Sequence, residues 1–346
     1  IGFFYVEKLI LSTSISQANI FGSGKFASIQ LNTGKLNRTV GFSYTDPYFT
    51  VDGVSQGFDV YHSRYNPISL GYAYRKESTG GGFRFGFPIG EKESINLGVA
   101  ADYTTVDINR NDPNTPLQYI HFTDRFCSGS NACSNTSYPL TAGWASDSKD
   151  SAINPTRGGI NRVTYEISPT GDIKYNRISF QRTQYFPVTR GMVLMLNGEV
   201  GLAKGLGGES LPYYKNYYAG GPGSVRGYDT ASLGPYEVGP NGIVRLGGVR
   251  RVVFNAELTL PLSDIGFGKD KSLRFGPFFD AGQVYGDKKA NQEAGVIAEG
   301  PIRMSSGFAV TWWSPFGPLK FSIAQPINRQ DNDKIQRFQF QMGQTF

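Results

Sequence analysis

The last twelve residues of the chain alternate between apolar and polar side chains. The apolar positions are Phe338, Phe340, Met342 and Phe346, and the positions between them are Gln339, Gln341, Gly343 and Thr345. Because successive side chains of a strand point to opposite faces, this strand has one apolar and one polar face. A transmembrane β-barrel places the apolar face against lipid, the polar face against a wet interior and aromatic residues at the interfaces. The segment predicts the last strand of a membrane barrel, and an edge strand of a soluble protein is the alternative.

The same alternation recurs along most of the chain. It is found at residues 9–16, 40–45, 95–104, 162–167, 252–260, 302–312 and 319–324. Short turns rich in Pro, Gly, Asn and Asp are interleaved with longer polar stretches at residues 64–78, 109–138, 203–248, 286–301 and 328–334. Outer-membrane barrels have short periplasmic turns and long external loops. The pattern predicts an all-β fold, an antiparallel transmembrane barrel of about sixteen strands that forms one domain over residues 1–346.

The composition agrees with a barrel and excludes other classes of protein. The mean hydropathy is −0.31, and no segment approaches the ~18 apolar residues that a membrane helix needs. The 346 residues include 44 glycines, and 14% are aromatic, which favours strands and turns. The net charge is +6, but the Lys and Arg residues are dispersed, which argues against nucleic acid as a partner.

The sequence indicates no metal, cofactor or catalytic site. Cys127 and Cys133 lie six residues apart in a polar stretch, where we expect a disulfide, with free thiols as the alternative. Two thiols are too few for structural zinc, and His62 and His121 are not at ligand spacing. The motif Gly-x-Ser-x-Gly is missing, and residues 22–25 lack the spacing of a phosphate-binding loop. We therefore expect neither an enzyme nor a cofactor.

Three charged residues are placed to meet inside the barrel. By the alternation, Glu257 lies on the polar face of its strand, and Asp280 lies on the polar face of the next one. A carboxylate in a confined interior is costly unless it is paired. The stretch 203–248 is too long for an idle loop, and we expect it to fold into the lumen. Its Arg226 can bridge two carboxylates, although Glu257 and Asp280 could also be merely hydrated interior residues.

Several motifs resemble the BamA family of outer-membrane assembly factors. Val225, Arg226, Gly227 and Tyr228 resemble the family's loop-six signature. Other similar segments follow in order along the chain, at residues 46–53, 86–89, 216–221, 278–282, 303–307, 314–319 and 324–326 and in the C-terminal strand. The resemblance covers the whole chain. It implies an integral barrel of the bacterial outer membrane that catalyses the folding and insertion of other β-barrel proteins.

The resemblance also implies partners and a role for the charged residues. The partners are unfolded β-barrel clients, accessory lipoproteins of the assembly complex and outer-membrane lipids. Family members carry periplasmic POTRA domains before the barrel, so we expect that upstream domains are missing from this chain. The family's loop-six Arg pairs with acidic residues on the following strands, which assigns that role to Arg226 with Glu257 and Asp280. Tyr228 stands where Phe is more usual, and the role of the cysteine pair cannot be carried over.

The family mechanism uses a lateral seam between the first and last strands. The implied seam residues are Gly2, Phe3, Phe4, Tyr5 and Val6 on the first strand and Phe338, Phe340, Met342, Gly343 and Phe346 on the last. We expect the last strand to span residues 335–346. A weakly paired seam can open sideways, and a client strand can then pair with the freed edge. Gly343 lets the last strand kink, or it only relieves crowding.

Three other functions compete with assembly. A passive porin agrees with the strand count, but a diffusion pore needs no motif such as residues 225–228. A related barrel that secretes a partner protein or assembles autotransporters would use the same fold. A barrel protease or lipase is disfavoured, because the chain lacks the motif and the histidine context of such an enzyme.

Overall fold

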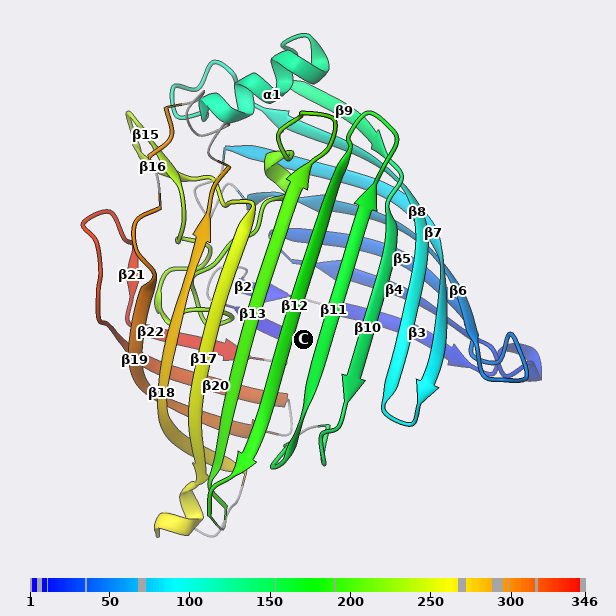
Figure 1. The fold of residues 1–346 in the computed structure, drawn as a ribbon, viewed down its shortest axis with the longest axis vertical. Helices are drawn as coiled ribbons and strands as arrows, with labels where there is room; N and C mark the ends of the chain where they lie inside the picture. The colour runs from blue at the N-terminus through cyan, green and yellow to red at the C-terminus, as the bar shows by residue number, and fades with distance from the viewer. Residues whose placement is uncertain are drawn as a thin grey trace.

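An antiparallel sheet forms almost all of the computed structural model and curls round on itself (Figure 1). The structure describes residues 2–4, 8–10, 12–34, 36–67, 73–152, 154–189, 191–266, 272–287, 295–297, 299–314 and 317–342. Of the expected seam residues, Tyr5, Val6, Gly343 and Phe346 lie outside these ranges. Within the described residues, no helix is long and apolar enough to cross a membrane.

The large sheet is built from eighteen labelled strands. The N-terminal ones are β1 (Gly2–Phe4), β2 (Lys8–Ile10), β3 (Ser12–Ala18), β4 (Phe26–Thr33), β5 (Asn37–Asp46), β6 (Ser55–Tyr65), β7 (Tyr74–Gly90), β8 (Glu93–Ile108) and β9 (Ala132–Ser137). The others are β10 (Leu140–Asp147), β11 (Gly158–Ser168), β12 (Tyr175–Pro187), β13 (Val193–Gly205), β17 (Arg250–Pro261), β18 (Leu273–Tyr285), β19 (Arg303–Ser314), β20 (Gly317–Pro326) and β22 (Phe338–Met342).

The smaller elements lie in the turns and loops between these strands. They are the strands β14 (Gly227–Tyr228), β15 (Tyr236–Gly239), β16 (Gly242–Arg245) and β21 (Ile335–Gln336), the helix α1 (Leu117–Cys127) and the 3₁₀ turns Ile20–Gly22, Tyr213–Lys215 and Leu262–Ile265. Strands β15 and β16 pair with each other, and β14 pairs with β21. In Figure 1, α1 and the β15–β16 hairpin lie at the same end of the sheet.

The labelled strands form a wall of sixteen strands, as the sequence predicts. One residue separates β2 from β3, and we count these two as one strand of the wall. Strands β9 and β10 pair with successive parts of β8 and likewise occupy one place. Counted in this way, the antiparallel sheet has sixteen strands. Strand β1 pairs with β22, which brings the two ends of the sheet together. The prediction of a sixteen-stranded all-β barrel is therefore confirmed.

The two faces of the wall differ as the alternation predicts. On β6, Val60 is 53% exposed on the outer face. The next residue, Tyr61, points to the inner face, where its hydroxyl donates to Asp102 on β8. Asp59, on the same inner face, forms an ion pair of 2.9 Å with Arg84 on β7. Because large apolar side chains cover the outside and charges pair inside, the outer face suits lipid and the inner face suits water.

Helix α1 was not predicted from the sequence. It lies in the stretch 109–138, which was expected to be a polar loop. Tyr119 and Phe122 are buried, and Phe126 packs its ring 4.8 Å from that of Phe122. These residues recur at helical spacing, so they form one apolar stripe that packs against a loop. The helix has three aromatic residues among its eleven, and within a polar segment this periodic pattern was too weak to predict a helix.

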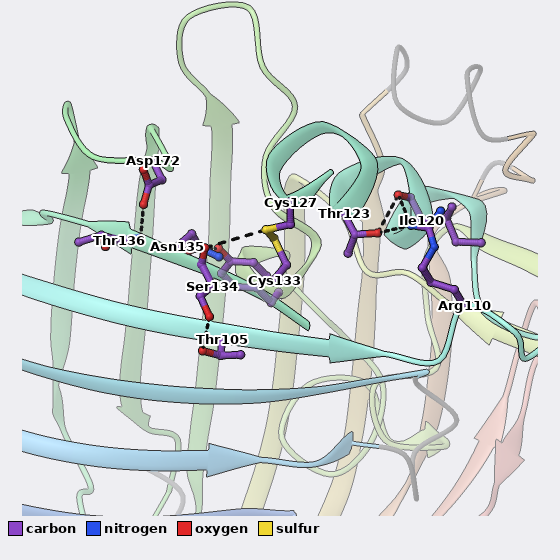
Figure 2. Close-up of a disulfide and its surroundings, with 11 residues drawn as sticks. Thr105, Arg110, Ile120, Thr123, Cys127, Cys133, Ser134, Asn135, Thr136 and Asp172 are labelled. Carbon is purple, nitrogen blue, oxygen red and sulfur yellow. Dashed lines mark hydrogen bonds between the residues drawn. A yellow bond between two sulfur atoms is a disulfide. The ribbon is translucent and has the colours of Figure 1, made fainter. Parts of the chain in front are cut away.

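The expected disulfide between Cys127 and Cys133 is present. Figure 2 shows that it joins the C-terminal end of α1 to β9. Strand β9 is in turn held on β8, where the hydroxyls of Ser134 and Thr105 lie 2.9 Å apart. At the other side of the helix, the guanidinium of Arg110 donates to the hydroxyl of Thr123 at 2.6 Å. The disulfide therefore fixes α1 to the wall at the end of the barrel.

The last strand is shorter than predicted. We expected one strand over residues 335–346, but the structure divides the segment at Arg337. Strand β22 pairs with β20, from Leu319↔Met342 to Ile323↔Phe338. Strand β21 turns away and pairs with β14 in the loop between β13 and β17. Alternation shows which face of the sheet a side chain occupies, but it does not show which strand its backbone pairs with. Here the backbone of Ile335 and Gln336 pairs with the loop between β13 and β17 instead of with a strand of the wall.

Candidate functional site

The loop between β13 and β17, which we call loop 6, carries the motif that the sequence singled out. Its tip is a compact turn, because the amide of Gly221 donates to the carbonyl of Val225 at 3.1 Å. Gly227 follows with φ +90°. A β-carbon at this position would lie 3.0 Å from the β-carbon of Ala324 on β20. A glycine is required here by both the left-handed backbone and the close approach to the wall.

Arg226 is the centre of a buried ion cluster on the inner face. Its Nε and Nη2 donate to the two carboxylate oxygens of Asp280 at 2.7 and 2.8 Å. Its Nη1 donates to Glu257 at 2.5 Å, and its backbone amide also donates to Asp280 at 3.0 Å. The side chains of Arg226, Glu257 and Asp280 are 5%, 5% and 0% exposed. The structure thus brings together the three charged residues that the sequence proposed, from loop 6, β17 and β18.

Three further residues complete the cluster, and none of them was predicted from the sequence to belong to it. Lys320 on β20 donates to both oxygens of Glu257, at 3.0 and 2.9 Å. Asn255 donates to Asp280 at 2.9 Å, and the ring of Phe278 lies 3.5 Å from the guanidinium carbon of Arg226. Two cations therefore balance two carboxylates. Lys320 alternates with apolar residues in the same way as Ser322 and Ala324, so the sequence already placed its side chain on the polar face. This alternation was the signal that could have identified Lys320 as a member of the cluster.

A second ion pair holds the segment that precedes the last strand. Asp333, between β20 and β21, accepts from Nε of Arg303 on β19 at 2.7 Å. Arg245, at the end of β16 in loop 6, donates to the neighbouring carbonyl of Asn332. We call Asp333, Arg303 and Arg245 the Asp333 cluster. It connects β19, loop 6 and the approach to β22, and all three side chains are buried.

Loop 6 is also bonded to the last strands through its backbone. Gly227 and Tyr228 pair with Gln336 and Ile335. Gln339 on β22 donates from its side-chain amide to the carbonyl of Tyr228 at 2.7 Å. The motif tip therefore contacts both the strands that follow it in the wall and the strand that ends the wall.

The first and last strands of the sheet meet at a seam. Phe4 pairs with Gln341, which is the one β1–β22 register pair among the described residues. On the other side of β22, five register pairs join it to β20. Phe338 is 58% exposed on the outer face, whereas Gln339 and Gln341 are buried on the inner face. Phe340 and Met342 share the outer side with Phe338 by parity.

Loop 6 and α1 pack together at the loop end of the barrel. The rings of Tyr119 and Tyr213 stack with centroids 4.0 Å apart, and Arg125 forms an ion pair with Glu209. Burial raises the pKa of Tyr213 well above its usual value. Glu237 accepts from the backbone amide of Leu117 at the start of α1 at 2.9 Å. Burial also raises the pKa of the Glu237 carboxyl.

Comparison with known proteins places this geometry in a family. The Omp85 superfamily domain matches residues 19–346. The chain is 35% identical to the outer membrane protein assembly factor BamA of Neisseria meningitidis, over 98% of this chain and 45% of that protein. It is 28% identical to the assembly factor BamA of Nitratidesulfovibrio vulgaris, over 97% of this chain and 40% of that protein. The chain thus spans less than half the length of these curated relatives.

Solved structures give the same assignment. A crystal structure of BamA from Haemophilus ducreyi lacking POTRA domains 1–3 superposes with a TM-score of 0.88 and 28% identity, over 100% of this chain and 69% of that one. CdiB from Acinetobacter baumannii shares the fold, with a TM-score of 0.58 and 15% identity, over 96% of this chain and 56% of that one. The resemblance to BamA found in the sequence is confirmed. The chain belongs to the Omp85 superfamily and is an integral β-barrel of the outer membrane.

Proposed function

We propose that this barrel catalyses the folding and insertion of other β-barrel proteins into the outer membrane. The observation that carries the proposal is the seam itself, where the first strand of the sheet meets the last and Phe4 pairs with Gln341. When such a seam opens, each freed strand edge is a template for another chain. A client strand that adds to such an edge satisfies its backbone groups by β-augmentation while it enters the lipid.

The side chains of β22 suit a strand that serves as a template. Phe338 lies on the outer face and Gln339 and Gln341 on the inner face. An incoming strand that pairs in register would place its own apolar residues outward and its polar residues inward. The freed edge would therefore select client strands with the alternation of a membrane barrel.

The Arg226 cluster has a positioning role in this proposal. Its contacts join loop 6 to β17, β18 and, through Lys320, to β20. A network that spans these strands keeps the wall next to the seam rigid while the seam itself opens. We further propose that the wall and the lumenal loop form one domain and that upstream periplasmic domains precede it in the whole protein.

The proposed partners follow from the same function. They are unfolded β-barrel clients, accessory lipoproteins that bind mainly to the upstream domains, and the lipids around the wall, with no nucleic acid among them. The work is strand exchange and needs no bond-making chemistry, so we propose a non-enzymatic protein without a cofactor. A barrel that translocates partner proteins is the alternative within the same fold. A passive pore is less consistent with the buried contacts of loop 6 against the wall.

A crosslink across the seam tests the proposal. In the full-length protein, Phe4→Cys and Gln341→Cys would be oxidised in cells that depend on it, and the assembly of other barrel proteins would be followed. We expect assembly to stop and to recover with a reductant. The control pair is Thr164→Cys and Ser179→Cys, which face each other between β11 and β12 and should leave assembly unchanged. Normal assembly with a complete seam crosslink would overturn the proposal and favour translocation or a pore.

A further inference from the structure

A group of arginines lies on the outer wall, outside the site described above. Arg38 is on β5, Arg64 on β6 and Arg75 on β7. The register pairs Arg38 with Arg64, Arg64 with Glu77, and Arg75 with Asp107 on β8. On β5 and β6 these positions continue the outward parity of Val40 and Val60. The group therefore faces away from the lumen, at the end of the strands from which the α1 loop leaves β8.

The arginines of this group are only partly compensated. Arg64 forms an ion pair with Glu77 at 3.1 Å, and His62 lies 3.5 Å from the same carboxylate. Arg38 and Arg75 have no side-chain hydrogen bond or ion pair with any residue in the part of the chain that the structure describes. Like charges directly opposite each other on neighbouring strands destabilise a sheet. The Arg38–Arg64 pair therefore carries a cost that a bound anion between the two guanidinium groups would remove.

The same residues line a cavity. Its volume is about 440 Å³, and its lining includes Arg38, Arg64, Arg75, Glu77 and Asp107. Three guanidinium groups face two carboxylates there, and one of the carboxylates is already shared by Arg64 and His62. A guanidinium can donate two parallel hydrogen bonds to a phosphate, which makes arginine well suited to binding one.

An apolar surface lies farther along the same outer face, beyond a short polar stretch that includes His62 and Thr79. Exposed large side chains lie farther along the same face of all four strands, namely Val40, Phe42, Val60, Phe83, Val99 and Tyr103. Cross-strand pairs such as Phe42↔Val60 and Phe83↔Val99 make this surface continuous. In an outer-membrane barrel this belt contacts acyl chains. A cationic cavity at one end of an acyl-chain surface has the two chemistries of a phosphorylated lipid.

We propose that this outer-wall cavity binds the phosphate group of a membrane lipid, with the acyl chains lying on the apolar belt below. The phosphate sits between Arg38 and Arg64 and is reached by Arg75 from β7. The site holds a lipid against β5–β8, on the first half of the barrel wall. It does not depend on the seam mechanism, because none of its residues lies on β1 or β22.

Lipid binding to the full-length protein in uncharged detergent tests this proposal. The probes are phosphatidic acid, phosphatidylcholine with the same acyl chains, and inorganic phosphate, with bound lipid measured by native mass spectrometry. We expect phosphatidic acid to bind more tightly than phosphatidylcholine, and the double variant Arg38→Gln and Arg75→Gln to weaken phosphatidic acid binding about tenfold. Binding should also weaken as salt increases, since the charges are partly exposed.

The matched control removes a charge from the opposite end of the same wall. Lys92 is exposed in the turn between β7 and β8, and Lys92→Gln should leave the selectivity for phosphatidic acid unchanged. Heat-modifiable migration on gels would show that both variants remain folded barrels. Equal binding of the two lipids, or unchanged binding to the double arginine variant, would overturn the site. Binding of inorganic phosphate as tightly as phosphatidic acid would overturn the lipid as its occupant.

Discussion

The side-chain amide of Gln339 on β22 donates to the backbone carbonyl of Tyr228 in loop 6 at a distance of 2.7 Å. This bond joins the strand that ends the wall to the motif that the Arg226 cluster fixes. Next to it, β14 and β21 pair through Gly227↔Gln336 and Tyr228↔Ile335. Loop 6 is thus bonded on one side to β17 and β18 and on the other to the last strand. Movement of β22 at the seam and movement of loop 6 are therefore expected to be coupled.

Replacing Arg226 with Ala should release loop 6. The change leaves Asp280 buried without its main partner and Glu257 with Lys320 alone, and breaking a buried ion pair on one side costs about 3–5 kcal/mol. Protease access to residues 206–249 should rise in the folded barrel. Arg226→Lys, which keeps the charge but loses the two-pronged contact with Asp280, should give an intermediate result. Unchanged protection of the loop in Arg226→Ala would show that the cluster does not hold it.

Replacing Gly227 with Ala should also loosen the tip, for a steric reason. Gly227 has φ +90°, and an added β-carbon would lie 3.0 Å from Ala324. A non-glycine residue in this region of backbone space costs about 1–3 kcal/mol. The matched control is Gly223→Ala, because an added β-carbon there meets nothing within 4 Å. The midpoint of thermal unfolding should therefore be lower for Gly227→Ala than for Gly223→Ala. Equal midpoints would contradict the role of Gly227.

Replacing Asp333 with Asn should free the approach to the last strand. Asp333 accepts from Arg303 at 2.7 and 3.2 Å, and a neutral amide cannot accept both bonds from the guanidinium. Hydrogen exchange over residues 335–342 should become faster, while exchange in β12 and β13 stays the same. The oxidation of Phe4→Cys with Gln341→Cys should change its rate in this background. No change in exchange before β22 would mean that the Asp333 cluster does not fix that segment.

The contact between Glu237 and α1 should depend on pH. Burial raises the pKa of Glu237 in the folded protein, so the neutral carboxyl is favoured when the hairpin β15–β16 packs on α1. Protonation of Glu237 therefore stabilises the packing of the β15–β16 hairpin on α1. This stabilisation is fully present below the pKa of an unperturbed Glu carboxyl and is lost as the pH rises through the raised pKa of Glu237 in the folded protein. Exchange protection of residues 117–120, corrected for intrinsic rates, should be greater at acidic pH. Glu237→Gln should remove this dependence, and a dependence that persists in this variant would exclude Glu237 as its source.

Much of the wall could be predicted from the sequence, because most strands of a membrane barrel alternate between apolar and polar residues. Each residue faces either lipid or the lumen, so parity alone placed Glu257 and Asp280 inside and Phe338 outside. The same alternation also placed Lys320 on the inner face, although its ion pair with Glu257 was not predicted. The spacing of Cys127 and Cys133 was enough to predict their disulfide, since six residues in one polar loop can bring two thiols together.

The tertiary structure decided which groups on the inner face meet. Sequence periodicity carries no information on how far loop 6 reaches, so the joining of Arg226 to both carboxylates required the fold. The same holds for residues 335–346, where the backbone of Ile335 and Gln336 pairs with loop 6 in place of a wall strand. The arginines on the outer wall are 26 and 11 residues apart in the chain, and only strand register makes them neighbours. Alternation fixes the face of a residue, whereas its partners depend on register and loop path, which long-range packing determines.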